Sequence, residues 1–255
     1  MDYHTLMGYV PLPDLLSLKR VLFVGPHPDD IEISSGGLVK KLINLGKEVY
    51  FLIVTDGGAG SKDPNITSEE LVLKRKEESR LAAEYLQVKK VEVLDFPDGG
   101  IYKPEEMSVE IAKRIIDIHP DAVFAPDPLL PTETHPDHLN CAKAVTNALG
   151  ISQFRLSALR HGIEIDKDQT LPSGINLVYY YTHRPNVIIA LDKDEFDAKI
   201  EAILKHESQI DESFAGIKMY LYYKATTLGR EIGSEYAEGY FAMGPVHQHC
   251  FLEKI

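Results

Sequence analysis

Histidine and aspartate occur together in three copies of one short pattern in this chain. The triplet His-Pro-Asp lies at residues 27–29, 119–121 and 135–137; the first copy continues into Asp30 and the third into His138. Two histidines with one carboxylate form the ligand set of an open catalytic zinc site, whereas a structural zinc site is closed by four ligands, usually rich in cysteine. The pattern therefore predicts catalytic metal chemistry.

The copies at 27–30 and 135–138 also have an interpretation without metal. Proline and aspartate form turns, and aspartate caps helices, so either copy alone is compatible with a simple turn. Together they supply more candidate side chains than one zinc ion needs, namely His27, Asp29, Asp30, His135, Asp137 and His138. Those that do not bind metal are candidates for a general base and an oxyanion stabiliser. Spacing alone does not determine which are ligands.

Short apolar runs alternate with helical patterns along the first part of the chain. Continuous apolar runs are typical of strands buried on both faces of a parallel sheet, and they lie at 21–25, 49–55, 91–96 and 122–126. Apolar residues at helical spacing occupy the intervals. This alternation predicts right-handed βαβ units and a Rossmann-like α/β fold, with a mostly parallel sheet and helices on both faces.

Position in this fold distinguishes the three copies of the triplet. In open α/β sheets, ligands bind outside the carboxyl ends of the strands. The copies at 27–30 and 135–138 follow strands, so we expect them to meet at that edge. His119 instead lies between a helix and the next strand, at the opposite edge. There a histidine at a helix C-terminus, followed by proline, has a structural role.

The pattern is looser after residue 150. Two further strands are predicted at 175–182 and 187–192, antiparallel or at a sheet edge, and an amphipathic helix at 194–210. No convincing linker interrupts the chain. We therefore expect a single domain over 1–255, with a core at about 19–150 and a C-terminal extension that decorates it at about 151–255.

Composition excludes several classes of partner. The chain has 255 residues, a formal net charge of −12 and two cysteines, Cys141 and Cys250, far apart in the sequence. An acidic protein is a poor ligand for nucleic acid or an anionic membrane. Cysteines without CxxC spacing favour a reducing compartment over a disulfide framework. Because no apolar run approaches ~20 residues and no signal peptide is apparent, we expect a cytoplasmic protein.

Several motifs, taken in order, resemble those of one family. The stretch "GPHPDDIEISSGG" with the later "HPDH" resembles the LmbE-like, or PIG-L, superfamily of zinc-dependent N-deacetylases, which remove acetyl groups from N-acetylglucosamine-type sugars. The resemblance extends over about residues 19–150 and includes "VTDGGAGS", "RKEESRLAAEYL" and "FPDGG". A later segment, "KHESQ", is similar to one near the C-terminal part of family members.

The resemblance implies a role for each residue of the two motifs. It assigns one Zn²⁺ per subunit to three ligands, which are His27, Asp30 and His138. It implies that Asp29 is the general base that activates the attacking water. His135 would stabilise the oxyanion, and Asp137 would hold His135 in place.

Residues outside these motifs match the family less specifically. Arg75 and Asp98 align with positions that contact sugar hydroxyls in relatives, although a salt bridge on a helix surface would also explain Arg75. Gly36 and Gly37 would allow the backbone to approach the metal closely, or would form a tight turn.

Three further histidines have weaker claims on the site. We expect His206, on the helix predicted at 194–210, to be a packing residue. His247 and His249 are consistent with a solvated tail. Some oligomeric relatives place a C-terminal histidine in the active site, from the same subunit or a neighbouring one, and by that resemblance His247 is the candidate for substrate binding.

The substrate and the assembly follow only from resemblance. The run "AVFAPDPLLPTETHPDH" resembles the archaeal diacetylchitobiose deacetylase branch, which implies GlcNAc or diacetylchitobiose as substrate; the bacillithiol-pathway branch implies GlcNAc-malate. A metal-dependent phosphoesterase and an inactive sugar-binding module are the alternatives from other classes. The resemblance also implies a homo-oligomer, a trimer or hexamer, and the aromatic segment at 219–228 is a candidate contact surface.

Overall fold

A seven-stranded sheet organises the protein. The computed structural model describes residues 8–100 and 102–248, and the strand order in its sheet is β3-β2-β1-β4-β5-β7-β6. The first five strands are mutually parallel, and β7 is antiparallel to both of its neighbours. The strands are β1 (Arg20–Gly25), β2 (Glu48–Thr55), β3 (Lys90–Phe96), β4 (Ala122–Pro126), β5 (Asn176–Tyr180), β6 (Val187–Leu191) and β7 (Tyr236–Met243).

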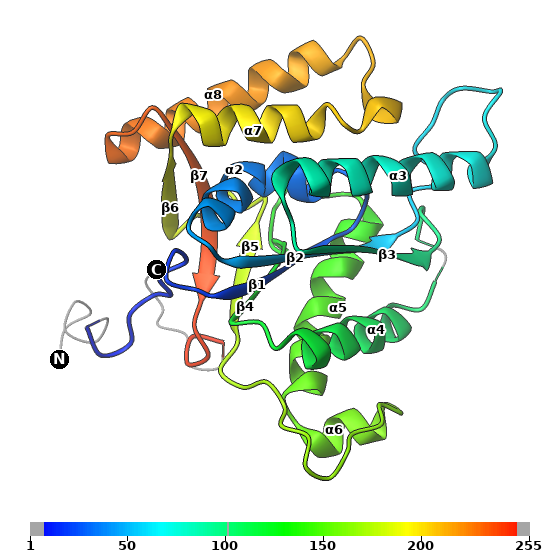
Figure 1. The fold of residues 1–255 in the computed structure, drawn as a ribbon, viewed down its shortest axis with the longest axis vertical. Helices are drawn as coiled ribbons and strands as arrows, with labels where there is room; N and C mark the ends of the chain where they lie inside the picture. Colours follow the sequence, from blue (N-terminus) through cyan, green and yellow to red (C-terminus); the bar gives the residue numbers. More distant parts are fainter. Residues whose placement is uncertain (1–7, 101, 249–255) are drawn as a thin grey trace.

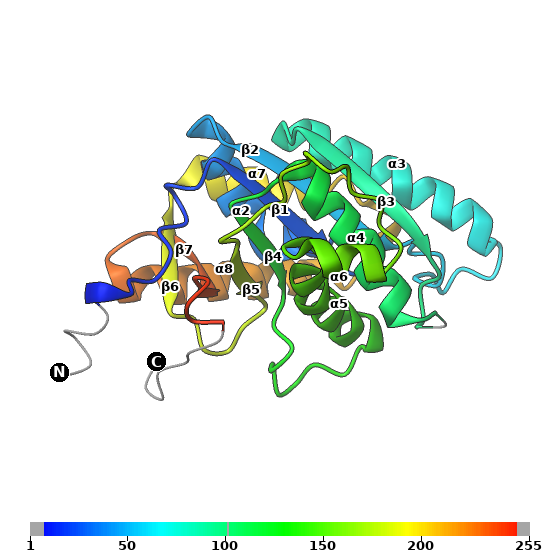
Figure 2. The ribbon, with the colours of Figure 1, turned by 90° about the horizontal axis from the view of Figure 1, so that it is seen from below.

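Helices cover both faces of this sheet (Figure 1). On one face lie α2 (Asp30–Asn44), α3 (Ser68–Leu86), α7 (Lys193–Ile203) and α8 (Phe214–Ile232). On the other lie α4 (Pro104–Ile118), α5 (Pro136–Ser152) and α6 (Arg155–Arg160), which are in front of the sheet in Figure 2. Each face has its own apolar core. The predicted α/β class is confirmed.

The central strands explain why the apolar runs are continuous. In β1 the four residues Val21–Val24 are all fully buried, because successive side chains point to opposite faces and both faces are covered. β1 pairs with β2 on one side and β4 on the other. The strand order therefore reverses between β1 and β4, and in such sheets the crevice at this reversal is where ligands bind.

The C-terminal third differs from the expectation. β5 pairs in parallel with β4 and antiparallel with β7, so it is not an edge strand, whereas β6 is antiparallel to β7 and lies at the edge, as expected. The predicted helix at 194–210 is too long: α7 ends at Ile203, and a short 3₁₀ helix, Glu207–Gln209, follows. Both α8 and β7 were missed. Because β5, β6 and β7 extend the same sheet, they support the expected single domain, which stays a prediction.

Neither interpretation of the paired glycines was right. Gly36 and Gly37 lie in the middle of α2, away from any turn. A Cβ on Gly36 would lie 3.0 Å from the side chain of Lys199, and one on Gly37 would lie 2.3 Å from Leu191 Cδ1. The glycines therefore let α7 and the end of β6 pack closely on α2.

Candidate active site

The two His-Pro-Asp motifs meet where the sequence predicted, at the carboxyl ends of β1 and β4. His27 follows β1, and Asp30 is the first residue of α2. His138 lies in the first turn of α5, which begins at Pro136. Proline suits this first helical position because it has no N–H to leave unpaired. The first motif therefore connects β1 to α2, and the second follows the loop after β4 and forms the start of α5.

His27, Asp30 and His138 lie at distances that suit one zinc ion. Asp30 Oδ2 is 3.1 Å from His27 Nδ1 and 3.4 Å from His138 Nε2. Three ligand atoms of these residues lie within 4.8 Å of one another. Ligands about 2.0–2.2 Å from a tetrahedral ion are themselves roughly 3.3–3.6 Å apart. The donor set therefore fits an open, three-ligand zinc site.

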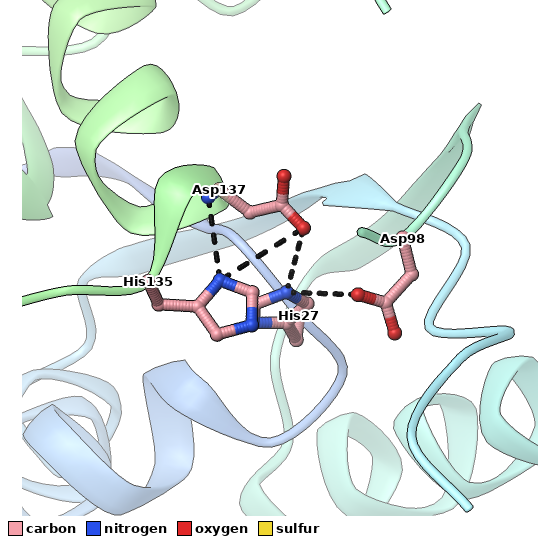
Figure 3. Close-up of side chains that lie close together, drawn as sticks. All are labelled: His27, Asp98, His135 and Asp137. Atoms are coloured by element: carbon pink, nitrogen blue, oxygen red, sulfur yellow. Dashed lines mark hydrogen bonds and ion pairs between the residues drawn. The ribbon is translucent and has the colours of Figure 1, made fainter. Parts of the chain in front are cut away.

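A carboxylate lies against the second ring nitrogen of each of these two histidines. His27 Nε2 lies 3.2 Å from Asp137 Oδ2 and 3.3 Å from Asp98 Oδ1, as Figure 3 shows. His138 Nδ1 lies 2.8 Å from Glu133 Oε2. Metal-binding histidines characteristically donate their other N–H to a carboxylate, which fixes the ring and its tautomer. Glu133 was not predicted, because only the folded loop shows that it contacts His138.

The electrostatics of these residues reflect their crowding. Burial alone would lower the pKa of His27, but hydrogen bonds to three carboxylates outweigh it and raise this pKa to about 11. Burial alone would raise the pKa of Asp30, but hydrogen bonds with His138 and His27 bring it far below its usual value. The site therefore concentrates negative charge around the two imidazoles, which favours a bound cation.

A second group of potential ligands shares His27 with the first; it consists of His27, Asp98, His135 and Asp137. Its carboxylates are already engaged: Asp137 accepts hydrogen bonds from Gly99 N at 3.0 Å and from the Tyr102 hydroxyl at 2.7 Å. His135 Nδ1 accepts from the backbone N–H of Asp137 at 3.3 Å and so caps α5. These bonds favour a supporting role for this group.

Asp29 has a backbone conformation unusual for its type. Its φ of 119° and ψ of −26° lie in a region that favours glycine, which costs about 1–3 kcal/mol unless the surroundings enforce it. Arg75 provides that support: its Nη2 donates to Pro28 O at 2.6 Å and lies 3.3 Å from Asp29 Oδ2. Burial and then the charge of Asp30 raise the pKa of Asp29 to about 7, and a nearby divalent cation would lower it again.

The remaining predicted site residues, which are His135, Asp137, Arg75 and Asp98, all lie close to the cluster. His135 is close to the cluster, with its ring centroid 4.6 Å from that of His27, and its side chain is 46% exposed, so a substrate can reach it. The Asp137 carboxylate contacts His27 and lies 4.0 Å from His135 Nδ1. Asp137 therefore holds His135 through its backbone N–H, which donates to His135 Nδ1. Arg75 is buried, so the alternative of a surface salt bridge is wrong. Sugar contacts by Arg75 and Asp98 stay predictions.

Other histidines lie apart from the cluster. His119 is the C-cap of α4, at the opposite edge of the sheet, as predicted. His247 follows β7 at that same opposite edge; its Nδ1 accepts from Gly244 N at 3.0 Å, and its Nε2 lies 3.2 Å from Val10 O. Within one chain it therefore does not join the site, and a role through a neighbouring copy stays a prediction. His249 lies outside the described residues.

An apolar cavity is separate from the cluster as well. It has a volume of about 610 Å³ and extends between α5, β5 and β7, with Leu129 and Phe154 in its wall.

Among the described residues, no helix has the length and apolarity that crossing a bilayer would require. Cys141 is buried in α5 with a free thiol, whereas Cys250 lies outside the described residues.

Comparison with known proteins identifies the family. A model of the PIG-L family, described as GlcNAc-PI de-N-acetylase, matches residues 22–149, half of the chain. The chain belongs to the PIG-L family. The diacetylchitobiose deacetylase of Thermococcus kodakarensis is 39% identical over 228 residues, 87% of this chain and 82% of that protein. The probable N-acetyl-alpha-D-glucosaminyl L-malate deacetylase 2 of Bacillus cereus is 26% identical over 76% of this chain and 84% of that one.

The fold of this PIG-L member agrees with a solved relative over almost its whole length. The N,N'-diacetylchitobiose deacetylase of Pyrococcus horikoshii, in complex with an inhibitor, matches with a TM-score of 0.85 and 32% identity over 98% of this chain and 96% of that one. Family membership confirms the predicted class of enzyme, an N-deacetylase of the hydrolase type. It argues against the phosphoesterase alternative.

Proposed function

We propose that this PIG-L protein removes the N-acetyl group from diacetylchitobiose or a related N-acetylglucosamine sugar and releases acetate, with one Zn²⁺ per subunit. One observation carries the proposal. In both His27 and His138, one ring nitrogen lies near Asp30 and the other lies near a second carboxylate. The 39% identity to a diacetylchitobiose deacetylase supports the substrate class.

The proposed chemistry divides between the metal and the surrounding side chains. When bound, zinc would polarise the acetyl carbonyl and lower the pKa of the attacking water. Asp29 takes the proton from that water and delivers it to the leaving amine, and Arg75 holds Asp29 in position at 3.3 Å. His135, with its exposed ring, donates to the oxyanion of the tetrahedral intermediate.

Charge at the site favours a neutral sugar over an anionic conjugate. Five carboxylates surround the ligand histidines or flank them in sequence, and they belong to Asp29, Asp30, Asp98, Glu133 and Asp137. Arg75, which already pairs with Asp29, lies among them and is buried. A GlcNAc-malate substrate would bring two further negative charges to this group of carboxylates, where Arg75 is already paired with Asp29.

A panel of substrates tests the proposal. Zinc-loaded protein is incubated separately with GlcNAc, diacetylchitobiose, GlcNAc-malate and a sugar phosphate, and acetate and phosphate are measured. We expect acetate from diacetylchitobiose with a kcat/KM at least ~10-fold above that for GlcNAc-malate. Faster hydrolysis of GlcNAc-malate would overturn the substrate class, and release of phosphate or of neither product would overturn the reaction. A cytoplasmic location and homo-oligomeric assembly stay predictions.

A further inference from the structure

Glu32 and His206 form a pair of ionisable side chains in the interior, beside the active site. Glu32 is fully buried in the first turn of α2, and His206 is fully buried just after α7. Glu32 Oε1 lies 3.4 Å from His206 Nε2, and no hydrogen bond reaches either carboxylate oxygen or either ring nitrogen within the described part of the chain. Burial alone would lower the pKa of His206, but the Glu32 charge raises it. A protonated His206 beside an ionised Glu32 leaves no uncompensated charge in this buried region.

The position of Glu32 makes this arrangement unexpected. Asp29 is the N-cap of α2 and Glu32 is three residues later, which is the spacing of a capping box. In α3 and α7 the same spacing produces both capping hydrogen bonds, from Thr67 with Glu70 and from Asp192 with Glu195. In α2 the Asp29 side chain makes no capping hydrogen bond, and Glu32 faces His206 instead. Neither carboxylate is used for capping.

Four charged side chains share this interior region. The charges of Asp30, Arg75, His206 and Glu32 act on Asp29, and the charges of Glu32, Asp29 and Arg75 act on His206. Asp30 contacts His27 and His138, so Arg75 and His206 are left to balance the charges of Asp29 and Glu32. The two terminal nitrogens of Arg75 donate hydrogen bonds to Gly57 O, Pro28 O and the Asp29 carboxylate. Its Nε has no hydrogen-bond partner within residues 8–100 and 102–248.

We propose that His206 is a positioning residue for catalysis: by neutralising Glu32, it leaves Arg75 to hold Asp29 in its strained conformation above the metal site. This inference rests on the proposed function, because it assigns Asp29 the role of general base. Without His206, Glu32 becomes an uncompensated buried charge that repels Asp29 and competes for the unpartnered Nε of Arg75. A displaced Asp29 accepts the proton of the attacking water less efficiently.

Variants of the pair test this role through kcat and bound zinc. We expect His206→Gln to keep its zinc and its KM while kcat falls about 10–100-fold, the size of effect produced by a displacement near 1 Å. Adding Glu32→Gln removes the uncompensated charge, so the double variant should recover to within about 5-fold of the parent. In an Asp29→Asn background, His206→Gln should change the residual kcat by less than about 2-fold, because no carboxylate remains to be positioned.

Lys199→Met is a matched control in α7, the helix that precedes His206. It unpairs another buried carboxylate, Glu238, which contacts Lys199 Nζ at 2.6 Å and the Gly37 amide in the second half of α2. It should lower the melting temperature and leave kcat unchanged. A similar fall in kcat for Lys199→Met would overturn the inference, because the loss would then follow general destabilisation.

Other outcomes are equally decisive. A folded, zinc-loaded His206→Gln with parental kcat, or a double variant as slow as the single one, would overturn the positioning role. An equally large fall in kcat when His206→Gln is added to Asp29→Asn would also overturn the positioning role. If His206→Gln does not fold, the double variant carries the test, and a folded, zinc-loaded but inactive double variant overturns it. Failure of the parent to deacetylate any sugar would instead refute the proposed function.

Discussion

Replacing Glu133 by glutamine isolates the support that a carboxylate gives to His138, a proposed zinc ligand. Glu133 Oε2 lies 2.8 Å from His138 Nδ1, and its Oε1 accepts from the His135 backbone N–H at 2.8 Å. Glutamine has the same shape and keeps an oxygen for the His135 amide, but its uncharged NH₂ group cannot replace the carboxylate oxygen that lies 2.8 Å from His138 Nδ1. The substitution therefore removes one charged acceptor and leaves the loop in place.

The expected loss is of metal affinity rather than of chemistry. Removing such a supporting carboxylate typically weakens metal binding about 10–100-fold, which corresponds to roughly 1.4–2.8 kcal/mol. Zinc affinity is measured by competition with a chelator of known affinity, and kcat is measured at saturating zinc, where we expect it within about 3-fold of the parent. Glu92→Gln is the control, since Glu92 pairs with Arg114 at 2.6 Å, away from the cluster. Parental zinc affinity in Glu133→Gln would refute the reasoning.

Three further predictions concern the base, the core and the assembly. Asp29→Asn should retain zinc while kcat falls about 10²–10⁴-fold with little change in KM, measured by acetate release and metal analysis; loss of zinc would contradict its role as base. Gly37→Ala should lower the free energy of unfolding in urea by about 1–3 kcal/mol, because its Cβ would meet Leu191 Cδ1 at 2.3 Å. Gly150→Ala, where the Cβ meets nothing within 4 Å, should be neutral or stabilising. Light scattering at micromolar concentration should give a trimer or hexamer, and a monomer would rule out 219–228 as a contact surface.

The sequence was most informative where local pattern and topology agree. The buried strands β1, β2, β3 and β4 were predicted almost to the residue, because continuous apolar runs have few other interpretations. That prediction placed the motifs after β1 and β4 at one edge. The structure brings them together there, with His27 and His138 both facing Asp30.

The missed elements depend on partners distant in the sequence. β7 contains Glu238 and Gly239, which weaken its strand pattern, yet Glu238 is buried against Lys199 and the amides of α2. The amphipathic pattern of 194–210 continues beyond Ile203, but there Ser208 donates its amide and hydroxyl to Glu78 of α3. These tertiary contacts outweigh local propensity.

The same limit applied to the site. Glu133 is two residues before His135, and no spacing rule links its side chain to His138. Tyr181 lies far along the chain, but its hydroxyl donates to Asp30 Oδ1 at 3.1 Å and its ring stacks on His138. Sequence patterns predicted the candidate ligands, whereas the residues that orient them became visible only in the fold.

Titration of metal-free protein with zinc tests the central claim most directly. Acetate release from diacetylchitobiose is measured as zinc is added in small steps, in parallel with the amount bound. If His27, Asp30 and His138 form one catalytic site, activity rises linearly and reaches its plateau at one zinc per chain, and His138→Ala loses binding and activity together. Full activity without metal, a plateau only at two ions per chain, or undiminished zinc in His138→Ala would contradict this account.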